Sequence, residues 1–412
     1  MGGISIAGAA QMLRPPADGL RYLRHDRAGE LSTTPGELTV DGTLIAAFEF
    51  SPDVPVQIDA SGCAVIPGLI DCHTHLPFVG WRAQEYAQKV AGVAYEQIAR
   101  DGGGIKSSAR SLAAASDDEV LAQAGAAAAE MLAHGTTSFE CKSGYGLSVD
   151  AEARSLRLAA QLAERVVQTT TSTALLAHAV PDGYDPDSWM ATIAAAMPDL
   201  LAAGRPTALD IYVESVAFSN DHLRQMGALA RRHGLALRAH VEQFNSHGSV
   251  PVALETGARS VDHLACLPPD HVAPLAASET AAVLLPGAAF LSDEHLEPGR
   301  QLADAGAICA LATDFNPGTS PVNSLPLTIG LAVRRYRWSV LEALLACTLN
   351  AAWVLDQPQV GSLEVGLRAD LLLLDGPVEQ IPYRLGHNPV ALVIVGGELV
   401  HVHPDHAWRV AA

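Results

Sequence analysis

The stretch VIPGLIDCHTHL, residues 65–76, ends an apolar run on two histidines separated by one residue. Side chains alternate between the two faces of a β-strand, so His73 and His75 point to the same side, with Asp71 behind them. A hydrogen-bonded core position would explain one such histidine. Two of them at the mouth of an apolar strand indicate half of a metal site, because neutral imidazole is a common ligand of zinc and similar metals. The remaining ligands must come from elsewhere in the chain.

The composition of the 412-residue chain is that of a globular protein, with 49% hydrophobic and 17% charged residues. Its formal net charge of −19 argues against nucleic-acid and anionic-membrane partners, since both need clustered Lys and Arg. No apolar run approaches the roughly 18 residues of a membrane-spanning helix, and the first residues lack a secretory signal pattern. The six cysteines form no C-x-x-C pair, so we expect reduced thiols and a cytoplasmic location.

Short β-branched or apolar runs alternate with longer Ala- and Leu-rich stretches after residue 76, and this rhythm indicates βα units. Eight runs are counted: the opening strand and those at 136–144, 166–180, 207–218, 235–243, 258–267, 281–290 and 308–316. Between them lie helical stretches such as 116–135, where Ser116 and Glu119 match a capping box. Without a G-x-G-x-x-G turn or a Walker loop, the eight runs predict a (β/α)8 TIM-type barrel rather than a doubly wound sheet.

The two ends of the chain differ from this pattern. Residues 31–65 and 360–412 contain alternating strands broken by D-G and G-G turns, which are typical of antiparallel β structure. We therefore predict a small β-sandwich domain assembled from residues 1–65 and 360–412, and a barrel domain over residues 66–359.

Polar residues collect where the predicted barrel strands end, and in a (β/α)8 barrel these ends form the active site. The first strand supplies His73 and His75, the fifth His240, the sixth His263 and the eighth Asp314. A helix cap or a satisfied core histidine would explain any one of them, but not four strands that deliver ligand types at one end. We predict one divalent metal per chain, Zn²⁺ or alternatively Fe²⁺, bound by these residues except His263. The latter would hydrogen-bond a carbonyl oxygen or transfer a proton.

Two further features bear on the metal. Binuclear sites of this kind bridge their metals with a carboxylated lysine on the fourth strand. That strand, DIYVESVAF at 210–218, contains no lysine, which favours a single metal. A water held by the metal would lose its proton more easily and provide hydroxide at neutral pH.

A series of motifs runs over roughly residues 65–375. It consists of PGLIDCHTHL at 67–76, Gly80 with Arg82, GGGI at 102–105, KSGYGL at 142–147, HAVP at 178–181, SVDHL at 260–264, LLPG at 284–287 and ATDFNPGTS at 312–320. Together they resemble the amidohydrolase superfamily and, within it, the imidazolonepropionase family. The first motif marks only the superfamily, whereas KSGYGL, HAVP and DFNPG together are far more specific.

This resemblance implies hydrolysis of the ring amide of 4-imidazolone-5-propanoate to N-formimino-L-glutamate, a step of histidine degradation. It implies that the predicted ligands hold the metal, and that Asp314 takes the proton of water and passes it to the leaving ring nitrogen. Substrate contacts are implied at Arg82, Tyr95, Tyr145, His178, Gln243, Asn316, Gly318 and Thr319.

The substrate implied by the resemblance is a small molecule that carries a carboxylate. Arg82 can bind a carboxylate with two parallel hydrogen bonds, and Tyr145 can add a hydroxyl group. The structural alternative for Arg82 is a surface ion pair with Glu85. A homodimer is the expected assembly.

Three positions depart from the family pattern. Trp81 stands where a smaller residue is expected, Gln243 where some members carry Glu, and His247 where glycine is usual. A deaminase or a cyclic amidohydrolase acting on another small heterocycle is the second hypothesis, and Glu in place of Gln243 would favour deamination. A non-catalytic barrel scaffold is less favoured, because such proteins usually lose ligands and none is missing. The role of Glu242 is left open.

Overall fold

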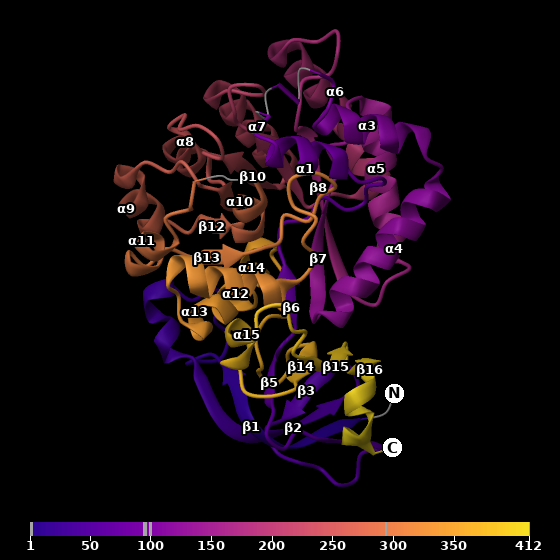
Figure 1. Ribbon diagram of the computed structural model, residues 1–412, viewed down its shortest axis with the longest axis vertical. Helices are drawn as coiled ribbons and strands as arrows, with labels where there is room; N and C mark the ends of the chain where they lie inside the picture. The colour runs from indigo at the N-terminus through magenta and orange to yellow at the C-terminus, as the bar shows by residue number, and fades with distance from the viewer. Residues whose placement is uncertain (1–2, 94–96, 99–100, 293–294, 412) are drawn as a thin grey trace.

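A computed structural model describes residues 3–93, 97–98, 101–292 and 295–411 (Figure 1). Within this part of the chain there are two β-sheets, an eight-stranded parallel sheet and a nine-stranded mixed sheet. In Figure 1 the mixed sheet lies at the lower end of the molecule, and both chain termini lie beside it.

The eight-stranded sheet curls into a barrel whose strands follow one another in chain order, each parallel to the next. The strands are β6 Leu69–Asp71, β7 Thr136–Lys142, β8 Thr169–Ala177, β9 Ala208–Tyr212, β10 Ala236–Val241, β11 Ser260–His263, β12 Ala281–Leu284 and β13 Cys309–Leu311. Each lies within the run predicted for it, and the (β/α)8 barrel is confirmed.

The first and last barrel strands meet just beyond their C-terminal ends. A parallel bridge joins Thr74 to Phe315. Below it, the buried carboxylate of Asp71 accepts hydrogen bonds from the hydroxyl of Thr313 at 2.6 Å and from its backbone N–H at 3.1 Å. The acidic residue behind the two histidines therefore helps to close the barrel beside the site.

Helices surround the barrel strands (Figure 1). The described α-helices are α1 Ala83–Val90, α3 Ile105–Ala114, α4 Asp117–Ala133, α5 Val149–Ala163, α6 Pro186–Gly204, α7 Asn220–His233, α8 Ser249–Thr256, α9 Pro269–Ala277, α10 Pro286–Ser292, α11 Gly299–Asp304, α12 Leu325–Tyr336, α13 Val340–Ala346, α14 Leu349–Val354 and α15 Gln380–Tyr383. The predicted capping box is present, since Ser116 and Glu119 each accept the other's backbone N–H. No helix in the described ranges is long and apolar enough to cross a membrane.

The mixed sheet takes its strands from both ends of the chain. They are β1 Ile4–Arg14, β2 Ser32–Asp41, β3 Leu44–Ala47, β4 Val56–Asp59, β5 Ala64–Pro67, β14 Leu371–Leu374, β15 Val390–Val395, β16 Glu398–Val402 and β17 Val410–Ala411. The antiparallel pair of β5 and β14 joins the N-terminal strands to the C-terminal ones. Buried apolar side chains such as Ile6, Leu38 and Leu392 form a core of its own. A second β structure built from both chain ends is therefore present beside the barrel. The domain limits at residues 65 and 360 stay a prediction.

Gly68 lies where the chain passes from the mixed sheet into the barrel. A methyl group on this residue would lie 2.1 Å from Thr137 Oγ1. Only glycine therefore lets β6 approach β7 closely at the start of the strand that leads to the two histidines.

Candidate active site

The four predicted metal ligands meet at the C-terminal ends of the barrel strands. His73 and His75 follow β6, His240 lies on β10, and Asp314 follows β13. The Oδ1 atom of Asp314 lies 3.5 Å from His73 Nε2 and 3.3 Å from His75 Nε2. One ligand atom from each of His73, His75 and Asp314 lies within 4.8 Å of the others, so these three residues could bind one ion.

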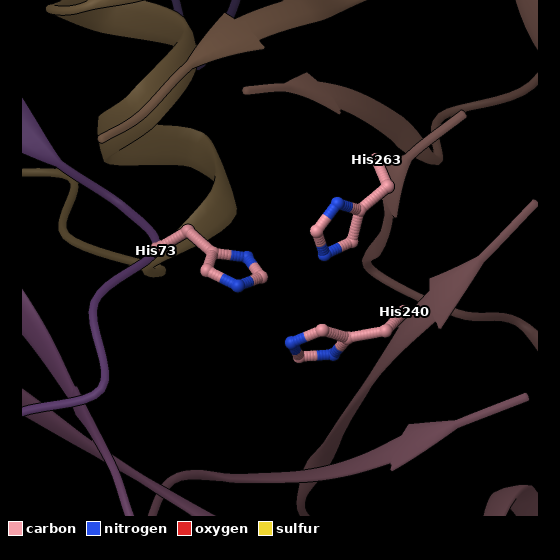
Figure 2. A group of neighbouring side chains, drawn as sticks. All are labelled: His73, His240 and His263. Atoms are coloured by element: carbon pink, nitrogen blue, oxygen red, sulfur yellow. The ribbon is translucent and has the colours of Figure 1, made fainter. Parts of the chain in front are cut away.

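A second group overlaps the first and consists of His73, His240 and His263. Figure 2 shows their rings pointing into one common space from three different segments of the barrel. Both groups contain His73, and the ring centroids of His75 and His240 lie 5.5 Å apart, so the five side chains form one cluster, called the metal centre below. Among the residues that the structure describes, these are the only groups of three that could hold a metal ion. That His263 stands beside the metal without ligating it stays a prediction.

The hydrogen bonds of two rings leave their other nitrogens facing this centre. His73 Nδ1 lies 2.6 Å from Asp262 Oδ2, and His240 Nδ1 lies 3.1 Å from Asp210 Oδ1. A carboxylate only accepts, so the proton of each neutral ring is on Nδ1 and Nε2 carries a lone pair. Both Nε2 atoms are buried, and neither has a hydrogen-bond partner in the described part of the chain. Such atoms fit a divalent metal, which would supply the missing partner.

Burial favours the neutral form of His73, His75, His178 and His263, and neutral imidazole is the form that binds a metal. Burial lowers the pKa of His73, His75 and His178 well below the usual value, and the pKa of His263 to about 3. Burial also raises the pKa of the Asp314 carboxyl group. A carboxyl group with a raised pKa can accept a proton and release it again.

Three strand-end residues adopt the left-handed backbone conformation, with φ of 54° at Glu242, 80° at His263 and 55° at Asp314. A left-handed backbone conformation costs roughly 1–3 kcal/mol in a residue other than glycine, and residues held in this conformation cluster at functional sites. At Asp314 and His263 the strained backbone aims the side chain at the centre.

A pocket opens over the centre. It is lined by His75, Arg82, Ile105, Tyr145, His178, Tyr212, His240, Gln243, Phe244, His263, Asp314, Asn316 and Thr319. Six of the eight predicted substrate contacts are among them. Gly318 lies beside Arg82, and Tyr95 lies outside the described residues.

Arg82 forms the ion pair that the sequence offered as an alternative, but it does so in the pocket wall. Its Nε lies 3.5 Å from Glu85 Oε2, and its side chain is only 7% exposed. Glu85 also accepts the backbone N–H of Gly104 at 3.1 Å. The Nη1 atom of Arg82 is buried and has no hydrogen-bond partner among the residues described. The ion pair therefore leaves part of the guanidinium group available to an anion in the pocket.

The loop 144–147 brings Tyr145 to the pocket. Glu152, buried in the first turn of α5, accepts three backbone N–H groups of this loop at 2.6 to 3.1 Å. His178 bonds to the same loop, with Nδ1 3.1 Å from the carbonyl oxygen of Gly144. Its ring stacks on His75 at a centroid distance of 5.2 Å. The sequence did not single out Glu152, although an acidic residue just after a glycine-rich loop is a usable signal.

The side chain of Asn316 forms hydrogen bonds within its own loop. Its Nδ2 donates to the carbonyl oxygen of Asp314 at 2.7 Å and to Thr319 Oγ1 at 2.9 Å. Its Oδ1 accepts the backbone N–H groups of Gly318 at 2.9 Å and Thr319 at 2.8 Å. Asn316 therefore shapes the loop that carries Asp314, and its contact with substrate stays a prediction.

Two of the departures from the family pattern lie away from the pocket, as far as the described residues show. Trp81 is 53% exposed and packs edge-on against Phe78. The Nε2 atom of His247 lies 2.8 Å from Glu214 Oε1. Neither side chain narrows the space over the metal centre, whereas the third departure, Gln243, lines it.

Glu242 has a structural role. Its two carboxylate oxygens accept the backbone N–H groups of His247 at 2.9 Å and Ser249 at 2.7 Å. Ser249 is the first residue of α8, so Glu242 binds one orphan amide of that helix and one amide of the loop before it. This answers the question that the sequence left open.

Comparisons with known proteins show the family of the chain. Residues 98–401 match the model of the amidohydrolase family, and the chain belongs to that family. It is 42% identical to the imidazolonepropionase of Herpetosiphon aurantiacus, covering 85% of this chain and 86% of that protein. It is 40% identical to the imidazolonepropionase of Cupriavidus pinatubonensis, covering 95% and 96%. Within the family, the chain therefore belongs with the imidazolonepropionases. It is an enzyme that hydrolyses carbon–nitrogen bonds in small molecules.

Solved structures share the fold at low sequence identity. A triazine hydrolase variant superposes with a TM-score of 0.72 at 18% identity, covering 97% of this chain and 94% of that one. An adenosine deaminase from Xanthomonas campestris with bound zinc has a TM-score of 0.71 at 17% identity, covering 97% and 93%. The family and the His/Asp cluster together support a divalent metal at the centre.

Proposed function

We propose that the chain hydrolyses the ring amide of 4-imidazolone-5-propanoate to N-formimino-L-glutamate, a step in the degradation of histidine. The observation that carries the proposal is one pocket that joins the histidine and aspartate centre to the buried guanidinium group of Arg82. An imidazolone ring over the centre would extend its propanoate toward that cation. The relatives at 40–42% identity are named for this activity.

The residues of the pocket divide the chemistry among them. A divalent metal, when bound, would polarise the ring carbonyl and lower the pKa of a water. Asp314 would take the proton of the attacking water and deliver it to the leaving ring nitrogen. His263, as a neutral imidazole, would donate a hydrogen bond to the carbonyl oxygen as charge develops on it. Arg82 and Tyr145 would hold the propanoate and so orient the ring.

The proposed metal is a single Zn²⁺ per chain, held by His73, His75, His240 and Asp314. Three nitrogens and one oxygen suit zinc, and Fe²⁺ is the alternative. A homodimeric assembly and a cytoplasmic location also stay predictions.

Deamination of another heterocycle is the competing hypothesis. Gln243 weighs against it, because an amide in the pocket wall cannot act as the general acid or base that a carboxyl group would provide. The likeness to the adenosine deaminase concerns the fold alone.

The test is an assay of metal-loaded protein with 4-imidazolone-5-propanoate, in which the product is identified by its mass and ammonia is measured in parallel. Hydrolysis gives the mass of the substrate plus one water and no ammonia. Metal-free protein and the imidazolone ring without its propanoate serve as controls. Ammonia release, or no turnover by metal-loaded protein, would contradict the proposal.

A further inference from the structure

Charged side chains fill the inside of the barrel beneath the metal centre. They are Glu140 and Lys142 on β7, Asp210 on β9, Arg238 on β10 and Asp262 on β11. Each is at most 1% exposed. Residues two apart in a strand share a face, so Glu140 and Lys142 point inward together. A buried charge costs several kcal/mol unless it is paired, so a layer of five needs a reason beyond packing.

One chain of contacts leads from Lys142 to His240. The Nζ of Lys142 lies 2.6 Å from Asp210 Oδ2 and 2.9 Å from Glu140 Oε2. The other oxygen of the same carboxylate, Asp210 Oδ1, lies 3.1 Å from His240 Nδ1. Lys142 therefore fixes one oxygen of Asp210 while the second oxygen faces the metal-ligating ring.

A second chain of contacts leads from Arg238 to His73. Arg238 Nη2 donates to Asp262 Oδ2 at 2.9 Å, and Ser260 donates its hydroxyl to Asp262 Oδ1 at 2.6 Å. Asp262 Oδ2 also lies 2.6 Å from His73 Nδ1. Glu140 pairs with both Arg238 and Lys142, so the two chains of contacts form one network.

This network gives each histidine the partner that decides which nitrogen faces the metal. A ring that donates from Nδ1 to a fixed carboxylate keeps the lone pair of Nε2 directed at the centre. Without its cation, each aspartate would be an uncompensated buried charge. Apart from the histidines, only neutral donors would then hold these carboxylates, namely Ile211 N–H on Asp210 Oδ1 at 2.7 Å and the Ser260 hydroxyl on Asp262 Oδ1 at 2.6 Å. Burial would lower the pKa of Lys142, but the carboxylates of Asp210 and Glu140 outweigh this and raise the pKa, so the amine stays charged.

We infer that Lys142 and Arg238 are positioning residues for the metal centre, which hold Asp210 and Asp262 as the acceptors of His240 and His73. The inference rests on the metal site of the proposed function. Lys142 enters from the second strand and occupies the space beside Asp210 as a fixed cation.

The test measures zinc affinity by competition with a chromogenic chelator, and folding by circular dichroism and the unfolding midpoint. Lys142→Met should weaken zinc binding about 10-fold, at the lower end of the roughly 10- to 100-fold loss that follows removal of a metal ligand's own hydrogen-bond partner, because Lys142 acts through Asp210. Lys106→Met is the matched control, since Lys106 pairs with Asp182 at the surface, and it should leave zinc affinity unchanged.

A double-mutant cycle separates positioning from general damage to the interior. If Lys142 acts through Asp210, the double variant Lys142→Met/Asp210→Asn should bind zinc within about 3-fold of Asp210→Asn alone. Losses that multiply would overturn the inference. A folded Lys142→Met variant with wild-type zinc affinity would overturn it as well.

A second variant serves if Lys142→Met does not fold. The double variant Glu140→Gln/Lys142→Met keeps the net charge of the interior and should show the same loss of zinc affinity, about 10-fold, because Asp210 has still lost its cation. Wild-type affinity in that variant would contradict the inference. Wild-type protein that binds no zinc would instead overturn the proposed metal site.

Discussion

Gly318 and Arg82 are in contact across the pocket wall: a methyl group on Gly318 would lie 1.5 Å from Arg82 Nη2. Glycine at this position therefore makes the room in which the guanidinium group lies. Gly318→Ala should displace Arg82 and lower kcat/KM for 4-imidazolone-5-propanoate, mainly through KM, while the metal content stays at its wild-type level. Steady-state kinetics with metal analysis check this. If Gly318→Ala left KM unchanged, the position of the guanidinium group would not determine how tightly the acidic substrate binds.

Arg82 itself should be the main source of selectivity for acidic substrates. Losing a charge-assisted bidentate pair costs on the order of 2 to 4 kcal/mol, which is roughly 30- to 1000-fold in kcat/KM. The kcat/KM of Arg82→Met should fall by about that factor with the acidic substrate and should change little with a ring that lacks the carboxylate. Equal loss with both substrates would make Arg82 structural, through its ion pair with Glu85.

His263 separates chemistry from metal binding. His263→Asn should keep the wild-type metal content and lower kcat by on the order of 10²-fold or more, as expected when a hydrogen-bond donor to a developing oxyanion is lost. Metal analysis and kinetics on the same preparation check both parts. If the variant loses its metal, His263 is a ligand, and one of the four proposed ligands has another role.

Glu297 should make stability depend on pH. Burial raises its pKa from 4.5 to about 7, so the folded protein binds this proton more tightly than the unfolded chain does. The resulting stabilisation is fully present below about pH 4.5 and is lost as the pH rises through about 7. Between pH 5 and 8, wild type should lose about 2 to 3 kcal/mol of unfolding free energy relative to Glu297→Gln. Urea unfolding of both proteins at the two pH values measures this difference. If the unfolding free energies of wild type and Glu297→Gln changed equally with pH, the raised pKa of Glu297 would be contradicted.

The sequence predicted the barrel and most of the pocket because both follow from local patterns. Apolar runs separated by helical stretches predicted the βα units, and each barrel strand lies in its predicted run. Ligand types at strand ends predicted His73, His240 and Asp314, because parallel strands bring their C-terminal ends together.

Other features depend on packing that no local pattern records. Strand β1, which pairs with β2, β4 and β5, was not predicted, because the burial of its side chains does not alternate and its register against β2 shifts twice. The inward faces of Glu140, Lys142 and Arg238 could not be assigned, because charged residues in short strands are usually exposed. Their burial is energetically possible because the barrel brings opposite charges together in one network of ion pairs.

In the proposed function, one metal centre and the cation of Arg82 act on the same small molecule. This function is tested most directly by comparing metal-loaded wild type with His240→Ala on 4-imidazolone-5-propanoate, with metal content, product mass and ammonia recorded together. Wild type should carry about one equivalent of metal per chain and form a product with the mass of the substrate plus one water, and the variant should lose both metal and product. Product formed by metal-free protein, or ammonia released while the ring stays closed, would contradict it.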